Sequence, residues 1–157
     1  MYSVYLGLGS NLGDKHENIK KAVTLIAERV GDVLTLSGFY ETEPWGYDSM
    51  ETYTNAAVGI ETTLSPEGLL SVTKDIEREM GRCEKTTDGK YCDRIIDIDI
   101  LLYDNLILQT PELTIPHPLM HLRQFVMRPL SEIAPDIVHP VLQKVVAKLS
   151  KELSLSE

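Results

Sequence analysis

Hydrophobic and polar residues follow two repeating patterns along the chain, and together they predict strands and helices in alternation. Apolar and polar residues alternate at the start of the chain, and three later runs are rich in β-branched and aromatic residues. These patterns predict strands over 2–8, 33–40, 53–62 and 95–102. Apolar residues spaced three and four apart predict amphipathic helices over 14–30 and from Ser65 to Gly81.

Both predicted helices carry local start signals. Asp14 is followed by Glu17 three residues later, which is typical of a helix cap. Ser65-Pro66 places a cap residue before a proline that suits the first helical turn. Gly31 and Gly81 follow the two apolar stripes and predict where the helices end.

The predicted order is strand, helix, strand, strand, helix, strand, followed by a C-terminal extension. The extension contains a hairpin-like stretch around 105–115 and helical pieces at about 122–133 and 141–150. The simplest closure is an α+β fold, a ferredoxin-like βαββαβ antiparallel sheet with both helices on one face. The other face is then free to carry a site. The length of 157 residues predicts one domain over 1–157.

Composition and charge narrow the possible partners. Apolar residues make up 43% and charged residues 25% of the chain, as in ordinary globular proteins. The formal charge of −9 argues against nucleic acid, which requires a basic surface. Cys83 and Cys92 lack the spacing of a zinc site, so we expect both to be free thiols. With no signal-peptide pattern, membrane-length apolar segment or pattern that demands an oligomer, we expect a soluble, cytoplasmic monomer.

The most informative local feature is a pair of aspartates in an otherwise apolar strand. Side chains alternate along a strand, so Asp97 and Asp99 share one face, roughly 7 Å apart at the backbone. Like charges near 6 Å repel by roughly 2 to 3 kcal/mol at an effective dielectric constant of about 20. Magnesium prefers carboxylate oxygen and would offset this repulsion. The opposite face is wholly apolar and must be buried under the helices: Ile96, Ile98, Ile100 and Leu102.

Two solvated surface aspartates are the alternative, because such pairs are common. The flanking Ile95 and Leu101 favour a partly covered face instead, and Arg94, His117 and Arg123 supply the cations that phosphate chemistry needs. Neither a dinucleotide-binding glycine fingerprint nor a P-loop occurs. The pattern therefore favours magnesium-dependent transfer from ATP to a small alcohol. Another magnesium-dependent phosphoryl transferase, or a non-catalytic module that binds the same ligands, is left open.

Several short motifs are highly specific when taken in this order and spacing. They are LGSN at 8–11, YxNAA at 53–57, Glu77 with Gly81-Arg82, RxxDxDILL at 94–102, PHP at 116–118, and RxF at 123–125 followed by Pro129-Leu130. The chain resembles the 6-hydroxymethyl-7,8-dihydropterin pyrophosphokinase family over about residues 2–140. The resemblance implies a ferredoxin-like fold with extra elements.

The resemblance also implies an activity. Members of the family are ATP-dependent diphosphotransferases of folate biosynthesis, which convert 6-hydroxymethyl-7,8-dihydropterin and ATP into the pterin diphosphate and AMP. Two magnesium ions bound through Asp97 and Asp99 would bridge the triphosphate. Catalysis then rests on positioning and charge neutralisation.

Individual roles follow from the same resemblance. It implies catalytic roles for Arg82, Arg94, Asp97 and Asp99. It implies nucleotide contacts for Glu77, Arg94, Ile100, Thr114, His117 and Arg123. It implies pterin contacts for Thr42, Pro44, Trp45, Tyr53, Asn55 and Phe125. Tyr53 and Phe125 look like an aromatic pair that sandwiches the flat heterocycle, and Asn55 can offer its edge a donor and an acceptor.

One segment departs from the family pattern. The family usually has Trp-Gly-Pro-Arg before the aspartates with basic residues ahead of it, whereas residues 91–94 read YCDR here and follow Glu84 and Asp88. Added acids beside a tetra-anion weaken its binding unless Lys85 or Lys90 compensates. We therefore expect a working enzyme with altered ATP affinity or loop closure.

Overall fold

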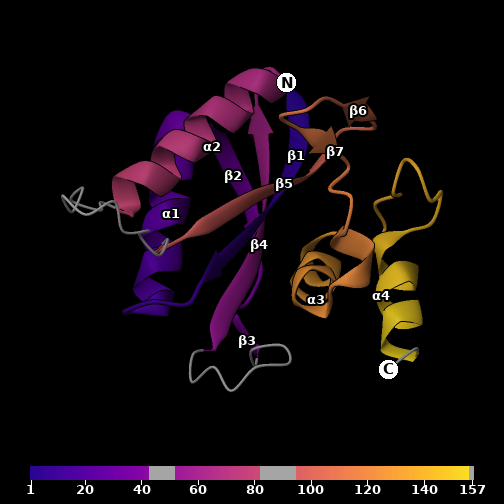
Figure 1. The fold of residues 1–157 in the computed structure, drawn as a ribbon. Coiled ribbons are helices and arrows are strands. Elements are labelled where there is room, and N and C mark those ends of the chain that lie inside the picture. Colours follow the sequence, from indigo (N-terminus) through magenta and orange to yellow (C-terminus); the bar gives the residue numbers. More distant parts are fainter. Residues whose placement is uncertain (43–51, 82–94, 156–157) are drawn as a thin grey trace.

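An antiparallel sheet forms the centre of the structure, a computed structural model that describes residues 1–42, 52–81 and 95–155 (Figure 1). Its strands are β1 (Tyr2–Ser10), β2 (Gly31–Leu36), β3 (Tyr40–Thr42), β4 (Tyr53–Thr62) and β5 (Asp97–Tyr103). The order is β2-β4-β1-β5, and β3 pairs with the start of β4. This is the expected ferredoxin-like order, so the predicted fold class is confirmed.

Helices cover the two faces of the sheet unequally. α1 (Lys15–Arg29) and α2 (Pro66–Met80) lie on one face, and α3 (Gln124–Ile133) and α4 (Val146–Leu155) lie beyond the other (Figure 1). The predicted caps are present, since the Asp14 carboxylate accepts from the Glu17 N–H at 3.2 Å and the Ser65 hydroxyl from the Gly68 N–H at 3.1 Å. No helix among the described residues is long and apolar enough to cross a membrane.

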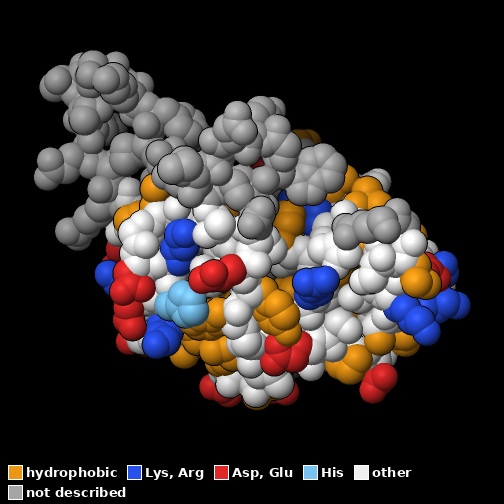
Figure 2. All heavy atoms as spheres, turned by 90° about the horizontal axis from the view of Figure 1, so that it is seen from below, with side chains coloured by type: hydrophobic (Ala, Val, Ile, Leu, Met, Phe, Trp, Pro, Cys, Tyr) orange, Lys and Arg blue, Asp and Glu red, His pale blue; other side chains and the backbone are white. Residues whose placement is uncertain are grey.

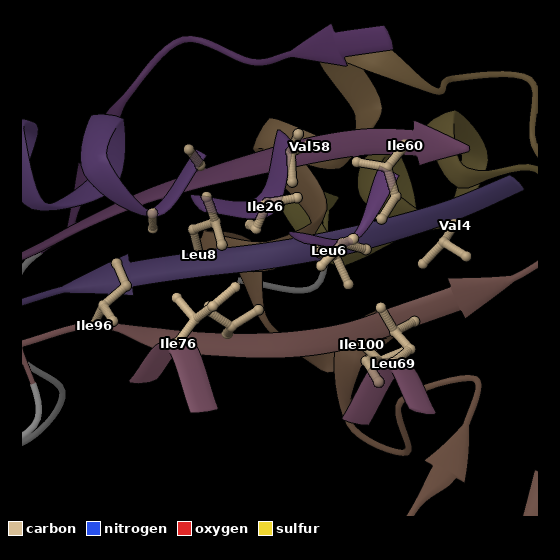
Figure 3. Close-up of a cluster of buried hydrophobic side chains, with 14 of the residues drawn as sticks. Val4, Leu6, Leu8, Ile26, Val58, Ile60, Leu69, Ile76, Ile96 and Ile100 are labelled. Atoms are coloured by element: carbon tan, nitrogen blue, oxygen red, sulfur yellow. The ribbon is translucent and has the colours of Figure 1, made fainter. Parts of the chain in front are cut away.

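The main core lies between the sheet and the α1/α2 pair. Branched side chains from β1, β4, β5 and both helices meet there (Figure 3). Its most buried members, each at most 3% exposed, include Val4, Leu6, Ile19, Ile26, Ile60, Ile76 and Ile98. Burying one such side chain contributes about 1.5 to 3 kcal/mol, so this layer holds the helices to the strands.

A second, smaller core lies on the opposite face, under α3. Met127 and Leu130 of α3 are fully buried, and they cluster with Ala57 of β4 and with Leu101 and Leu102 of β5. α3 therefore covers only the part of this face where those strands carry apolar residues.

A register shift in β5 corrects one sequence prediction. Tyr5 pairs with Leu102 and Leu6 with Ile100, so Leu101 is an extra residue between them. Alternation predicted Leu102 on the helix-covered face, whereas the bulge turns it into the second core beside Leu101. Ile96, Ile98 and Ile100 do lie in the main core as predicted.

The predicted second strand, 33–40, is two strands with a corner between them. β2 ends at Leu36, and β3 starts at Tyr40. At the corner, Ser37 replaces part of the regular ladder, because its hydroxyl accepts from the Ala57 N–H at 2.9 Å and donates to the Gly38 carbonyl at 2.7 Å. These local side-chain bonds allow the chain to turn between β2 and β3, while β4 continues beside both as one strand.

The C-terminal extension follows the prediction in outline. The hairpin is β6 (Leu108–Gln109) with β7 (Thr114–Ile115), and a short 3-10 helix, η1 (Met120–Leu122), precedes α3. The last helix starts at Val146, later than the predicted 141–150, because a turn occupies the intervening residues. In that turn the Gln143 N–H donates to the His139 carbonyl at 2.8 Å.

Candidate active site

Among the described residues, the sheet face opposite α1 and α2 is covered by α3 at one end and uncovered at the other. At the closed end, α3 packs over Ala57, Leu101 and Leu102. Gly7 and Gly9 of β1 form a glycine strip on this face. Gly7 pairs with Ala57 and is covered by the Leu101 side chain, 3.4 Å from where its Cβ would lie, so at the open end β1 contributes Gly9 alone. Glycine has no side chain, so a ligand can approach the backbone there.

Two carboxylates and a carboxamide surround this glycine strip. Gly9 pairs with Asp97 of β5 on one side and with Asn55 of β4 on the other, and Gly7 pairs with Asp99. Directly paired residues project to the same face, so the three side chains share it. Both aspartates are half-buried, as expected for a partly covered face, and Asn55 is buried.

Gly9 is in tight contact with this set. A Cβ atom at Gly9 would lie 3.0 Å from Oδ1 of Asn55 and 3.9 Å from Cδ1 of Tyr53. The first distance is shorter than an ordinary carbon–oxygen contact, so a side chain here would push the carboxamide away. The absence of a side chain at Gly9 therefore leaves the space that the Asn55 and Tyr53 side chains use.

Thr42, Tyr53 and Asn55 gather on two paired strands. Thr42 of β3 pairs with Tyr53 of β4, and the Asn55 Nδ2 donates to the Thr42 hydroxyl at 3.1 Å. This bond orients the carboxamide. Its second N–H and its carbonyl can form hydrogen bonds with the edge of a flat heterocycle. Tyr53 is 37% exposed and so is accessible from solvent.

The start of α3 brings Arg123 and Phe125 together. Arg123 is the residue before the helix, and its guanidinium carbon lies 5.6 Å from the centre of the Phe125 ring. This distance is in the range of a cation–π contact. Both side chains are half-buried, so α3 presents a cation and an aromatic face side by side.

His117 is held next to the aspartate strand. Its backbone N–H donates to the Leu101 carbonyl at 3.0 Å, at the bulge of β5. Its ring Nδ1 accepts from the Leu119 N–H at 3.2 Å, so in the neutral ring the proton is on Nε2. Burial lowers the pKa of His117, the Asp99 carboxylate raises it, and Arg123 lowers it. His117 thus offers an N–H donor between a carboxylate and a cation.

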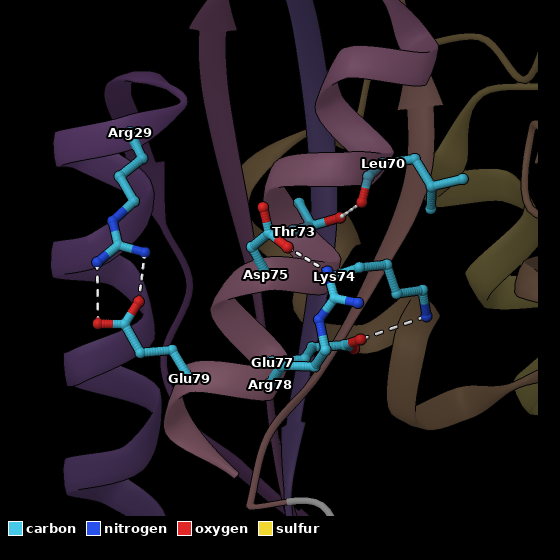
Figure 4. Close-up of polar contacts among 8 residues, drawn as sticks. All are labelled: Arg29, Leu70, Thr73, Lys74, Asp75, Glu77, Arg78 and Glu79. Carbon is cyan, nitrogen blue, oxygen red and sulfur yellow. Dashed lines mark hydrogen bonds and ion pairs between the residues drawn. The ribbon is translucent and has the colours of Figure 1, made fainter. Parts of the chain in front are cut away.

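Glu77 reaches the outer edge of β5 from α2 (Figure 4). The carboxylate is 5% exposed, and its Oε2 accepts from the Ile98 N–H at 2.7 Å. Its Oε1 pairs with Lys74 Nζ at 3.2 Å. β5 is the last strand of the sheet, so Glu77 satisfies a backbone donor that lacks a neighbouring strand, between the two aspartates.

Ile100 and Thr114 lie differently from the other predicted nucleotide residues. The Ile100 side chain is inside the main core, so only its backbone is at the edge of β5. Thr114 is on β7 beside a cavity of about 170 Å³, which His117, His121, His139 and Leu142 also line. Side-chain contact with a nucleotide is therefore not open to Ile100.

Four predicted site residues fall outside the described part of the chain. They are Pro44, Trp45, Arg82 and Arg94. The YCDR segment at 91–94, which departs from the family pattern, also lies outside it. On the face shown in Figure 2, lysine and arginine side chains are dispersed among acidic and apolar ones.

Two residues that the sequence analysis did not single out adjoin the site. Tyr40 of β3 pairs with Asn55, and its hydroxyl donates to Glu132 of α3 at 2.5 Å. Strand alternation with Thr42 could have placed Tyr40 on this face. No local signal could have found Glu132, which is 92 residues away in the chain.

Fold and site together define a class of protein. It is a ferredoxin-like α+β protein with an acidic site beside two glycines on the sheet face opposite α1 and α2. A family model described as 7,8-dihydro-6-hydroxymethylpterin-pyrophosphokinase matches residues 5–135. The chain belongs to this family, as the motifs indicated.

Similar proteins support the assignment. This chain spans nearly all of some of them and only part of others. A 2-amino-4-hydroxy-6-hydroxymethyldihydropteridine pyrophosphokinase from Porphyromonas gingivalis is 51% identical over 89% of this chain and 95% of its own. One from Aquifex aeolicus is 38% identical over 99% of this chain and 94% of its own. A folic acid synthesis protein from Dictyostelium discoideum is 42% identical over 96% of this chain, which spans only 22% of it.

Solved structures agree on the fold. A Plasmodium falciparum protein described as HPPK-DHPS, in a crystal structure with pteroate, superposes with a TM-score of 0.78 at 17% identity. The match covers 96% of this chain and 42% of the solved chain. At this identity the likeness concerns the fold alone, and the chain spans less than half of the solved protein.

Proposed function

We propose that this chain transfers the pyrophosphoryl group of ATP to the hydroxymethyl group of 6-hydroxymethyl-7,8-dihydropterin, in folate biosynthesis. The relatives are named as pyrophosphokinases of this pterin. The observation that carries the proposal is the arrangement of Asp97, Asp99 and Asn55 around a glycine strip on the open face. It supports the proposal because two carboxylates suited to magnesium and phosphate lie beside a carboxamide suited to the edge of a heterocycle.

The pterin side of the site is built from β3, β4 and α3. Asn55, oriented by Thr42, reads the edge of the heterocycle, and Gly9 gives the ring room to approach. Tyr53 and Phe125 supply the aromatic walls, because flat rings stack favourably at van der Waals distance. Pro44 and Trp45 would complete the frame from the segment outside the described residues.

The nucleotide side is built from β5 and the segment that follows it. His117 Nε2–H and the Arg123 guanidinium donate to triphosphate oxygens, and Arg82 and Arg94 add positive charge. The Ile98 N–H points away from β1 toward Glu77, so the peptide groups of Ile100, two residues on, share that outer edge. These groups and Thr114 suit the donors and acceptors of an adenine ring.

The aspartate pair fits magnesium. Asp97 and Asp99 share one face of β5, and no group of three His, Cys, Asp or Glu side chains suited to a metal occurs among the described residues. Magnesium is commonly held by one or two carboxylates, with water and substrate phosphates completing its shell. Two magnesium ions at Asp97 and Asp99 would neutralise the triphosphate and hold it in line for attack.

In the proposed reaction, the hydroxymethyl oxygen bonds to the β-phosphorus of ATP and loses its proton. The bond from that phosphorus to the oxygen bridging to the α-phosphorus breaks, and AMP leaves with the electron pair. The chain contributes by placing the alcohol and the phosphorus within reach and by stabilising charge on the phosphate oxygens. No residue needs to form a covalent intermediate.

Product analysis tests the proposal. We expect incubation with ATP, magnesium and 6-hydroxymethyl-7,8-dihydropterin to release AMP and the pterin diphosphate in equal amounts. ADP or free phosphate as the nucleotide-derived product would contradict it and point to another phosphoryl transfer.

Replacement of the metal-binding pair separates catalysis from binding. Asp97→Ala should lower turnover by about three orders of magnitude, because charge on the triphosphate is no longer offset. Pterin affinity, measured by fluorescence titration, should change little. Turnover near that of the unmodified chain would remove Asp97 from the mechanism.

A further inference from the structure

A single carboxylate on α3 holds the corner between β2 and β3. Glu132 Oε1 accepts from the Gly38 N–H at 3.0 Å and from the Tyr40 hydroxyl at 2.5 Å, and its Oε2 is 3.2 Å from the same Gly38 nitrogen. Glu132 is exposed and lies near the end of α3. The carboxylate thus joins a helix to a strand from a distant part of the chain.

The strand that Glu132 holds carries one wall of the pterin site. β3 has only three residues, and within the sheet it pairs with β4 alone. Tyr40 pairs with Asn55 and Thr42 with Tyr53, so any movement of β3 moves the groups that orient the Asn55 carboxamide. A strand this short has few ladder bonds, and contacts from outside the sheet therefore affect its position strongly.

The helix that carries Glu132 also carries the opposite wall. Phe125 lies in the first turn of α3, and Glu132 follows seven residues later. Seven residues make about two helical turns, which places both side chains on one side of the helix, roughly 10 Å apart along its axis. The same helical face therefore bears an aromatic wall and the anchor of the other wall.

The hydrogen bond between Tyr40 and Glu132 is suited to holding β3 and α3 together. The hydrogen bond to Glu132 raises the pKa of Tyr40, burial raises it further, and Arg128 lowers it. The phenol therefore stays protonated at neutral pH and donates to an ionised acceptor. Hydrogen bonds to a charged acceptor are shorter and stronger than neutral ones, so Glu132 limits how far β3 and α3 can separate.

We propose that Glu132 is a positioning residue that sets the width of the slot between Phe125 and the Thr42/Tyr53 wall. Its effect is on pterin binding, because β3 carries none of the nucleotide-side residues, and the second core, not Glu132, seats the helix that begins at Arg123. The inference rests on the proposed function, since it assigns the slot to the pterin.

Kinetics with each substrate varied in turn test this role. We expect Glu132→Ala to raise the KM for the pterin about tenfold and to leave the KM for ATP within about twofold. Tyr40→Phe, which deletes one hydroxyl, should raise the pterin KM about threefold. The double variant should resemble Glu132→Ala alone, because both changes break one linkage. Glu132→Gln keeps a carbonyl acceptor of the same length and should recover part of the affinity.

A surface carboxylate of similar setting provides the matched control. Glu152 of α4 pairs with Lys144 at 3.2 Å, away from the site, so Glu152→Ala should leave both KM values unchanged. An unchanged pterin KM in Glu132→Ala and Tyr40→Phe, or an equal rise in the ATP KM, would overturn the proposal. If Glu132→Ala does not fold, Tyr40→Phe alone decides by the same criterion.

Failure of the proposed function is a separate outcome. Pterin dissociation constants from fluorescence titration give the same comparison without turnover. If the unmodified chain binds the pterin but releases no AMP, the transfer reaction is wrong, and the titration still decides the role of Glu132. If it is active and the variants keep their pterin affinity, only the positioning role is wrong. If it binds no pterin, both are wrong.

Discussion

At the scale of single residues, the site depends on the absence of side chains at the glycines of β1 as much as on the polar side chains of β4 and β5. Gly9 leaves the sheet bare between Asp97 of β5 and the Asn55 carboxamide of β4, and Gly7 leaves room for the Leu101 side chain. The alternation that places Gly9 on this face also places Leu8 in the main core. One local pattern therefore serves packing on one side and binding on the other.

The role of Gly9 can be tested by adding one methyl group. In Gly9→Ala the new Cβ would meet Asn55 Oδ1 at 3.0 Å, so the carboxamide must move. Overpacking of about 1.4 kcal/mol corresponds to about a tenfold rise in the pterin KM, which steady-state kinetics would measure. Gly7→Ala is the comparison, because its Cβ meets Leu101 at an ordinary 3.4 Å and should have a smaller effect. Equal effects of both changes would contradict the role of Gly9.

At the scale of elements, the edge strand β5 needs support from outside the sheet. β1 pairs with one side of it, and on the other side Glu77 accepts from Ile98 and His117 donates to Leu101. These two contacts come from α2 and from the segment after β7. They hold the strand that carries both aspartates, which explains why a buried glutamate on a helix lies beside the site.

Removal of the Glu77 anchor should loosen this strand. Glu77→Ala leaves the Ile98 N–H without its acceptor, which costs about 1 to 3 kcal/mol of unfolding free energy, and AMP release should slow. Glu77→Gln keeps a carbonyl acceptor and should lose less. Lys74→Ala removes only the half-exposed ion pair and should cost at most about 1 kcal/mol. Urea unfolding of the three variants measures the order, and a loss in Lys74→Ala as large as in Glu77→Ala would contradict it.

The turn before α4 contains a buried histidine, His139, and we expect its titration to make the stability of the fold depend on pH. His139 is 3% exposed, and its Nδ1 accepts from the Leu142 N–H at 3.1 Å. Burial lowers the pKa of His139, and neighbouring His121 lowers it further. The unfolded chain therefore binds this proton more readily than the folded one, so stability falls as pH drops through the ordinary pKa of about 6.5.

Unfolding in urea at pH 7.5 and pH 5.5 checks this sign. The unmodified chain should be less stable at pH 5.5. His139→Gln should be less stable than the unmodified chain at pH 7.5 but should lose less on acidification. His117, whose pKa is also lowered, accounts for part of the remaining slope. An equal loss in both chains would exclude His139 as a source of the effect.

At the scale of the whole molecule, the sheet separates two cores with different tasks. The main core fixes α1 and α2, and the second core fixes α3, which carries Arg123 and Phe125 to the site. Truncation of the second core should therefore affect stability and pterin binding together. The same fold occurs within a longer solved chain, of which this chain spans 42%.

Leu130 offers the direct test of this coupling. Leu130→Ala leaves a cavity under α3 and should cost about 2 to 5 kcal/mol of unfolding free energy. Pterin affinity of the folded variant should also fall, because α3 is less firmly seated. Leu155→Ala changes a side chain that is 76% exposed and should alter neither quantity by much. Undiminished affinity in a destabilised Leu130→Ala would separate the two roles.

The sequence by itself determined the features that depend on local geometry. Period-two alternation placed both aspartates on one face, period-3.6 stripes with Asp14 and Ser65 caps defined α1 and α2, and their order led to the fold. The family motifs added the function. Each of these rests on residues close together in the chain, where backbone periodicity alone sets the direction of side chains.

Only the tertiary structure decided what depends on distant partners. The bulge that moves Leu102 to the second core depends on the register with β1, and the split of β2 from β3 depends on how each of them pairs with β4. Glu132 meets Gly38 across 94 residues of chain. Contacts at such separation arise from the packing of whole elements, and no pattern within one element encodes them.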